Sequence, residues 1–114
     1  MVKKKLPQIK KIVASYLKVL AKQGVKVERA ILFGSYARGL ATPSSDIDLV
    51  VISRDLSQWP FIERLQMLSR STLAVGEPLE VIGYTPAEIK KRGGKSIFWA
   101  EITSHGREIY RQAA

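Results

Sequence analysis

The clearest periodic pattern in the sequence lies between Lys10 and Gln23. Apolar residues in and just before this segment recur three and four positions apart, as they do on one face of an amphipathic helix. Pro7 near its start and Gly24 just after its end are typical of the two ends of a helix. The pattern therefore predicts a helix over 10–23 whose buried face consists of Ile9, Ile12, Val13, Tyr16, Leu17 and Leu20.

Shorter apolar runs predict strands. Three of them cover Ala30–Phe33, Asp46–Ser53 and Leu79–Tyr84, with Gly, Ser or Pro at their borders. The centre of the second run, Leu49–Ile52, is apolar on both faces, which is typical of an interior strand. A short edge strand is expected over Arg107–Arg111.

Further helices are predicted in the second half of the chain. One covers Phe61–Val75, another opens at Pro86, and a last one covers Ile97–Ser104. Thr85, followed three residues later by Glu88, predicts a capping box at the start of the second of these helices. The candidate core contacts of the first are Phe61, Ile62, Leu65, Leu68 and Leu73.

This order of elements predicts an α+β (α/β-like) fold, in which helices pack on a small mixed β-sheet. The chain has 114 residues. Because separate cores usually need about 100 residues each, we expect a single domain over residues 1–114.

The composition limits the kinds of functional site that the chain can contain. The chain has no cysteine and one histidine, His105, which excludes disulfide frameworks, thiolate zinc sites and cysteine nucleophiles. No apolar run approaches the roughly 20 residues of a membrane-spanning helix, and Lys10 and Lys11 interrupt a signal-peptide pattern, so we expect a cytoplasmic protein. The net charge of +9 suits nucleotides, nucleic acid or an acidic protein surface. Part of it lies in Lys90–Lys95, which is expected to form a basic loop.

Two aspartates open the second predicted strand. Side chains at i and i+2 of a strand point to the same face, so Asp46 and Asp48 should aim together. Two carboxylates there are unfavourable unless a cation neutralises them, and oxygen ligands without His or Cys favour Mg²⁺ or Mn²⁺. Two such ions serve phosphoryl transfer. The alternative is that Ser45 and Asp46 cap a turn and that Asp48 is only an exposed strand residue.

A glycine-serine pair follows directly on the first strand. A turn that enters a helix at Gly34 and Ser35 would present free N–H groups, which favour a phosphate. The Ser35 hydroxyl and the Arg38 guanidinium add further donors. Together with the aspartates, these residues predict a site for a nucleoside triphosphate and Mg²⁺. The alternative is a connection that needs its glycines for geometry alone.

The combined pattern, Gly-Ser-Tyr-Ala-Arg-Gly at 34–39 and Ser-Asp-Ile-Asp-Leu at 45–49, resembles the signature of the nucleotidyltransferase superfamily that includes DNA polymerase beta. It is most similar to the minimal nucleotidyltransferases of prokaryotes, which are often encoded beside HEPN-domain toxins and act as their antitoxins. The resemblance covers Ile31–Tyr84 well and the C-terminal part loosely. It implies the nucleotidyltransferase fold and a Mg²⁺-dependent transfer of AMP, or another nucleoside monophosphate, from a nucleoside triphosphate to a hydroxyl.

The family's third carboxylate lies on a later neighbouring strand and is usually Asp, whereas Glu80 stands at that place here. Glu77 is the alternative if the register differs, and a solvated strand charge is the alternative role for Glu80. The catalytic and metal-binding residues implied by the resemblance are Asp46, Asp48 and Glu80, and the nucleotide-binding residues are Gly34, Ser35 and Arg38.

Three functions remain open at this level. The first is an enzyme that adenylylates a tyrosine hydroxyl of a partner HEPN toxin and thereby silences it. The second is a binding module that keeps the fold, has weak or no catalysis because of the Glu80 departure, and neutralises its partner by forming a complex. The third, suggested by the charge, is RNA binding or RNA-end modification, which would show salt-sensitive RNA binding.

Overall fold

The computed structural model describes residues 3–92 and 96–113 of the chain. It has the predicted mixed α+β architecture. Its elements are α1 (Leu6–Lys22), β1 (Arg29–Phe33), α2 (Gly34–Ala37), β2 (Ile47–Ile52), the 3-10 helix η1 (Arg54–Gln58), α3 (Phe61–Thr72), β3 (Leu79–Tyr84), α4 (Pro86–Arg92), α5 (Ile97–His105) and β4 (Arg107–Arg111). Over these residues, no helix combines the length and the apolar character that crossing a membrane requires.

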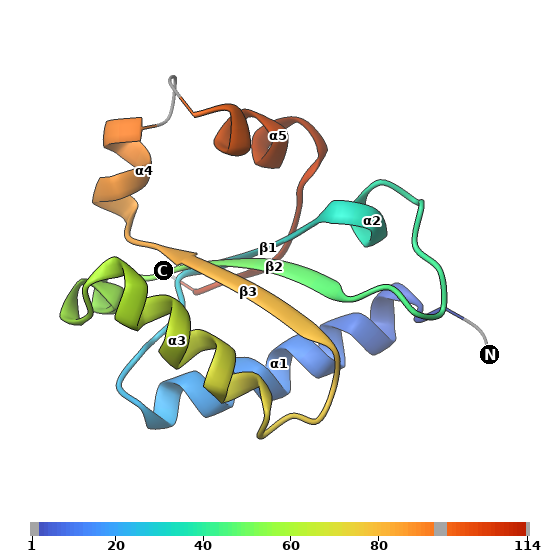
Figure 1. Ribbon diagram of the computed structural model, residues 1–114, viewed down its shortest axis with the longest axis horizontal. Coiled ribbons are helices and arrows are strands. Elements are labelled where there is room, and N and C mark those ends of the chain that lie inside the picture. Colours follow the sequence, from blue (N-terminus) through green and yellow to red (C-terminus); the bar gives the residue numbers. More distant parts are fainter. Residues whose placement is uncertain (1–2, 93–95, 114) are drawn as a thin grey trace.

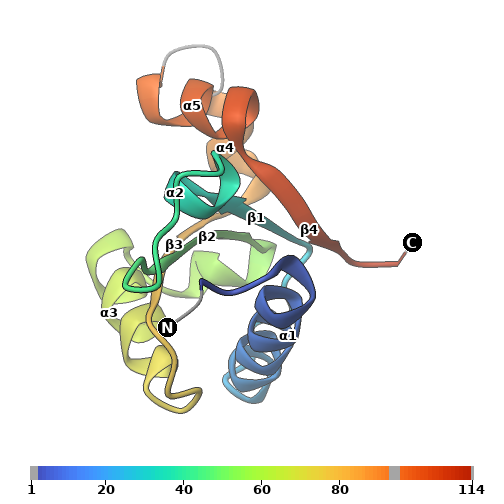
Figure 2. The same ribbon diagram turned by 90° about the vertical axis from the view of Figure 1, so that its right-hand side faces the viewer.

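The four strands form one mixed sheet in the order β3-β2-β1-β4. β1 is antiparallel to both β2 and β4, whereas β2 and β3 are parallel and are connected through α3. Figures 1 and 2 show α1 and α3 against one face of the sheet and α4 and α5 on the other side. The sheet therefore separates two layers of helices, with β2 in its interior.

β2 supplies side chains to both layers. Ile47, Leu49 and Val51 belong to the main core together with residues of α1 and α3. Val50 and Ile52 point the other way and belong to a second buried cluster with Ile31 and Ile102, the latter from α5. Since alternate residues of a strand face opposite sides, this placement explains the unbroken apolar run and confirms the predicted interior strand.

Several boundaries and one short element differ from the sequence predictions; α3, for instance, ends at Thr72 rather than Val75. α1 begins at Leu6 rather than Lys10, since Pro7 lies in its first turn, where a missing N–H costs no helical hydrogen bond. η1 was not predicted, because its five residues are too few to display a helical period; it is held at its start by the Ser53 hydroxyl, which accepts from the Asp55 N–H at 3.1 Å.

The predicted core face of α3 is correct at Leu68, which is fully buried, but wrong at three other positions. Phe61, Ile62 and Leu73 are 39%, 66% and 81% exposed. The buried positions of α3 lie three and four residues apart on a face that includes Leu68 but none of these three residues. They are Arg64, Met67, Leu68 and Ser71.

Arg64 occupies a core position because other groups neutralise its charge and accept its hydrogen bonds. Its side chain is 3% exposed and donates to Glu88 at 2.7 Å and to the Gly83 carbonyl at 3.3 Å. Such pairing is what allows a charged group to be buried. The pattern of apolar residues alone could not indicate this face.

The capping box at α4 is confirmed. The Thr85 N–H donates to the Glu88 carboxylate at 2.8 Å, and the Glu88 N–H donates to the Thr85 hydroxyl at 3.2 Å. Burial alone would raise the pKa of Glu88, but the hydrogen bonds from Arg64 and Thr85 lower it below its ordinary value. In the predicted basic loop, Lys90 and Lys91 belong to α4, while residues 93–95 lie outside the described part of the chain.

Candidate active site

Asp48 and Glu80 lie side by side at the edge of one face of the sheet, the face that lies toward α4 and α5. The parallel register of β2 and β3 places them directly opposite each other. Asp48 lies on the same side of β2 as Val50, and Glu80 on the same side of β3 as Tyr84, both of which pack in or against the cluster under α5. The register therefore selects Glu80, and not Glu77, as the neighbour of Asp48.

The environment of Asp48 disfavours its charge. Burial, a hydrogen bond with Glu80 and the negative charges of Glu80 and Asp46 together raise the pKa of Asp48 to about 6. Two neighbouring carboxyl groups in this situation retain a proton that a solvated aspartate would lose. The cluster thus has an excess of negative charge that a cation would relieve.

The position of Asp46 differs from the predicted one. β2 begins at Ile47, so Asp46 lies one residue before the strand and is exposed, although its charge still acts on Asp48. Among the described residues, no three His, Cys, Asp or Glu side chains already converge closely enough to hold a metal ion. Two carboxylates are thus together in place, and the third lies on the adjoining loop.

Gly34 forms the closest contact between the turn and these carboxylates. Its φ is +68°, a left-handed value that residues with a Cβ rarely adopt. A Cβ at this position would overlap the carboxylate of Asp48, which lies directly against the glycine. The antiparallel pairing of Phe33 with Asp48 produces this approach, because it brings the end of β1 to the start of β2. The predicted turn is thus adjacent to the predicted carboxylates.

Ser35 lies in the first turn of α2, next to Gly34. The first turn of a helix leaves N–H groups without acceptors inside the helix. Backbone hydrogen bonds close the turn, from Arg38 N–H to Gly34 at 3.1 Å and from Leu40 N–H to Ser35 at 2.9 Å. This arrangement holds the Gly34–Ser35 segment in a fixed conformation beside Asp48.

Arg38 and Tyr36 connect the turn to distant segments. Arg38 is exposed and forms a long ion pair of 3.5 Å with Glu101 of α5. Tyr36 packs against the main core, and its hydroxyl accepts from the Lys4 backbone N–H at 3.3 Å. The sequence pattern did not indicate these contacts, because they join residues 32 and 63 positions apart.

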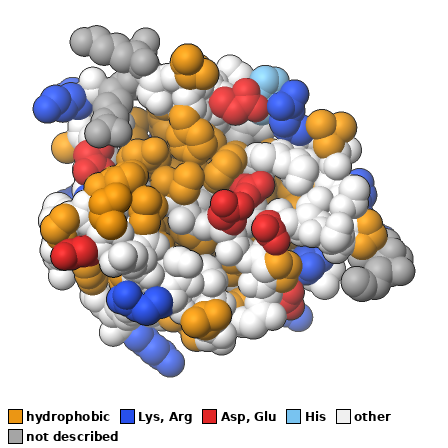
Figure 3. All heavy atoms as spheres, viewed as in Figure 1, with side chains coloured by type: hydrophobic (Ala, Val, Ile, Leu, Met, Phe, Trp, Pro, Cys, Tyr) orange, Lys and Arg blue, Asp and Glu red, His pale blue; other side chains and the backbone are white. Residues whose placement is uncertain are grey.

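An apolar surface lies beside the carboxylates. Figure 3 shows apolar side chains gathered on this face of the molecule, with acidic side chains next to them. Four aromatic rings on this side pack in succession, with centroids 5.5 Å apart for Phe33 and Phe98, 6.4 Å for Phe98 and Tyr84, and 6.3 Å for Tyr84 and Trp99. The site thus combines paired carboxylates, a glycine turn and an apolar floor.

Comparison with known proteins identifies the family. The sequence model of the nucleotidyltransferase domain matches residues 6–103, which is most of the chain. The chain belongs to the nucleotidyltransferase family. A curated relative, the "putative protein adenylyltransferase" of Methanocaldococcus jannaschii, is 37% identical over 79 residues, which are 69% of this chain and 78% of the relative.

Solved structures share the fold of this nucleotidyltransferase. A crystal structure of a "putative nucleotidyltransferase" from Sulfolobus solfataricus matches with a TM-score of 0.59 and 19% identity, covering 91% of this chain and 78% of that one. A toxin–antitoxin structure with AMP-PNP matches with a TM-score of 0.56 and 21% identity, covering 90% and 73%. A mutant MntA-HpeT toxin–antitoxin structure matches with a TM-score of 0.58 and 21% identity, covering 88% of this chain and 72% of that one.

The donor set of the nucleotidyltransferase site fits a hard divalent cation. Asp48 and Glu80 offer only carboxylate oxygens, the ligand type that Mg²⁺ and Mn²⁺ prefer. Burial, first, and the negative charges of Glu80 and Asp46 raise the pKa of Asp48 and disfavour its charged form. A cation bound by Asp48 and Glu80, with Asp46 beside them, would compensate this negative charge.

Proposed function

We propose that this nucleotidyltransferase transfers AMP from ATP to a hydroxyl group of a partner protein, and that it acts as the antitoxin of a HEPN-domain toxin in the cytoplasm. The observation that carries the proposal is the contact of Gly34 with Asp48, which brings the phosphate-binding turn against the paired carboxylates. The name of the Methanocaldococcus jannaschii relative supports a protein acceptor, and the toxin–antitoxin structures with the same fold support a protein partner.

In this proposal the turn holds the leaving part of ATP. The N–H groups and hydroxyl of Gly34 and Ser35 bind the β- and γ-phosphates, since a helix start attracts anions. Asp46, Asp48 and Glu80 would hold Mg²⁺, which would supply positive charge against the phosphates. Arg38 is a secondary phosphate contact and would have to leave Glu101 to reach the nucleotide.

The transfer itself exchanges one phosphorus–oxygen bond for another. The acceptor oxygen forms a bond to the α-phosphorus, and the bond from the α-phosphorus to the bridging oxygen of pyrophosphate breaks. The hydroxyl proton passes to a carboxylate of the Asp48–Glu80 pair, and pyrophosphate leaves.

The test is the incubation of the purified chain with α-labelled ATP, MgCl₂ and a HEPN-domain protein from the same genome. We expect label on the partner, and we expect Asp48→Asn to abolish this transfer while still binding the partner. Label transfer by Asp48→Asn at the wild-type rate would contradict the assignment of the site. A stable complex of the wild-type chain with its partner, formed without any label transfer, would favour the alternative function of a non-catalytic binding module.

A further inference from the structure

The net positive charge of the chain is concentrated in its N-terminal quarter. Residues 1–29 contain nine Lys and Arg residues against the single acid Glu28, whereas the rest of the chain contains ten against nine. The first segment therefore carries a net +8 of the total of +9. Four of these nine residues, Lys10, Lys11, Lys18 and Lys22, lie in α1, whereas Arg29 lies in β1 and pairs with Glu108.

The lysines of α1 lie on its outer side. Ile9, Ile12, Val13, Tyr16 and Leu20 bury the inner side against the sheet and α3. Lys11, Lys18 and Lys22 are exposed and are spaced seven and four residues apart, which places them along one line on a helix. At about 1.5 Å per residue this basic stripe, defined as Lys11, Lys18 and Lys22, spans about 16 Å.

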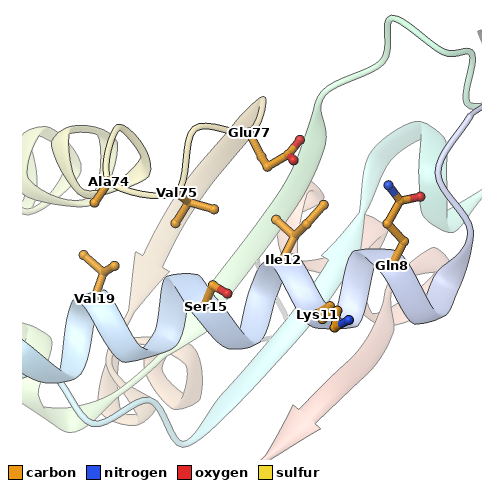
Figure 4. A pocket seen from close by; sticks show the side chains of 8 residues that line it. All are labelled: Gln8, Lys11, Ile12, Ser15, Val19, Ala74, Val75 and Glu77. Atoms are coloured by element: carbon orange, nitrogen blue, oxygen red, sulfur yellow. The ribbon is translucent and has the colours of Figure 1, made fainter.

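The stripe is not neutralised within the described chain. α1 contains no acidic residue, and none of the three lysines forms an ion pair with a described acidic side chain. Glu77 lines a groove of about 390 Å³ next to α1 and pairs with Lys4 at 3.8 Å. Figure 4 shows Glu77 across this groove from Ile12, with Lys11 and Ser15 on α1.

The composition of this side favours a polyanion over a protein partner. Protein interfaces are depleted in lysine and depend on large apolar or aromatic anchors. The large apolar side chains exposed on the described surface are Leu40, Phe61, Ile62, Leu73, Ile97 and Tyr110, and none belongs to α1. Between the lysines α1 exposes only Ala14, Ser15 and Ala21 from its smaller residues. Tyr110 of β4 lines an apolar groove of about 350 Å³ together with Lys18, but Lys11 and Lys22 do not line it. Lysines in a row suit phosphates, which they contact as point charges.

We infer that the outer side of α1 binds the phosphodiester backbone of a nucleic acid, without reading its sequence. The stripe is long enough to follow several phosphates along one strand. It lies on the layer of α1 and α3, whereas Asp48 and Glu80 face the layer of α4 and α5. The two surfaces are therefore separate, and nucleic-acid binding on one leaves the nucleotidyl-transfer site on the other accessible.

The experiment compares two matched variants of the full chain. Lys18→Gln/Lys22→Gln removes two charges from the stripe, and Lys90→Gln/Lys91→Gln removes two exposed charges from α4 on the other layer. Fluorescence anisotropy measures the affinity of each protein for a labelled RNA duplex and a labelled DNA duplex of about 20 base pairs, between about 50 and 200 mM NaCl.

We expect the wild-type chain to bind with an affinity that falls steeply with salt. The stripe variant should bind about tenfold more weakly, and the slope of log affinity against log salt should become shallower by about 1.5 to 2, as for two lost phosphate contacts. The α4 variant should stay within about twofold of wild type. Equal binding of both duplexes would identify the backbone alone as the ligand, and tighter binding of RNA would add its 2′-hydroxyls.

Three results would overturn the inference. The first is that neither duplex binds at low salt. The second is that the two variants lose affinity equally. The third is that poly-glutamate displaces the duplex at a lower charge concentration than unlabelled duplex does, which would indicate an acidic protein as the ligand. Label transfer to the HEPN partner provides an independent readout. It should be unchanged in the stripe variant, so failure of this inference would not affect the proposed function.

Discussion

Replacing Asp48 by Asn should stabilise the protein while removing its transfer activity. The fold raises the pKa of Asp48 from 3.8 to about 6, so the folded chain holds a proton that the unfolded chain releases between these values. At 1.36 kcal/mol per pH unit the difference corresponds to about 3 kcal/mol. Because the Asp48 side chain is partly exposed and water screens it, we expect about 1 kcal/mol.

The sign of this effect depends on pH. A raised pKa of an acid means that its stabilising contribution is complete below about pH 4 and lost as the pH rises through 6. The advantage of Asp48→Asn over wild type should therefore be near zero at pH 4 and complete above pH 7. Asparagine keeps the size of the protonated side chain and cannot ionise.

Urea denaturation followed by circular dichroism at pH 4 and pH 7.5 measures the effect, with the exposed Glu63→Gln as the control for a lost surface charge. MgCl₂ at pH 7.5 should raise the melting temperature of wild type and leave that of Asp48→Asn nearly unchanged, because the cation compensates a charge that the variant lacks. A variant that is no more stable than wild type at pH 7.5, or whose advantage is the same at pH 4, would refute this account of Asp48.

Three further outcomes are expected. Gly34→Ala should lower the free energy of unfolding by about 2 kcal/mol or more. Gly39→Ala, also at positive φ but with open space around it, should lower it by about 1 kcal/mol. Equal losses in urea denaturation would show that the overlap with the neighbouring carboxylate does not affect stability. Initial rates of label transfer should fall strongly for Glu80→Gln and persist for Glu80→Asp, because an amide accepts no proton and is a poor Mg²⁺ ligand, and an unchanged rate for the glutamine variant would exclude Glu80 from the site. Glu88→Gln should destabilise the chain by about 3 kcal/mol and Arg64→Met by less, since only the first leaves a buried charge unpaired, and thermal melts showing the reverse order would contradict this.

The sequence was sufficient for the parts of the fold that depend on local pattern. Three such patterns each lie within a few helical turns or one strand. They are the apolar periodicity of α1, the two-sided apolar run of β2 and the capping box of Thr85 and Glu88. The adjacency of the glycine turn and Asp48 also followed from the motif, although the sequence suggested a shared phosphate site and not direct contact between the two.

The rest depends on contacts between distant residues. The predicted face of α3 was correct at Leu68 but missed Arg64, whose burial depends on Glu88, 24 positions away. The choice between Glu77 and Glu80 required the parallel register of β2 and β3, which no local pattern contains. The sequence motif includes Arg38 but not its partner Glu101. The ion pair between Arg38 and Glu101 of α5 could therefore be found only in the structure.

The contact between Gly34 and Asp48 also sets an order in which this site can be lost during evolution. As long as Asp48 keeps its carboxylate, any side chain at position 34 meets it, so the glycine is held in place by its neighbour as well as by its own backbone. Once Asp48 is replaced by a smaller residue, the overlap with the carboxylate disappears, and the 3.2 Å approach to the Cβ of residue 48 and the positive φ remain. Lineages in which this fold has become a purely binding protein should therefore first change Asp48 and only later Gly34, and descendants with a substituted Gly34 beside an intact Asp48 should be rare.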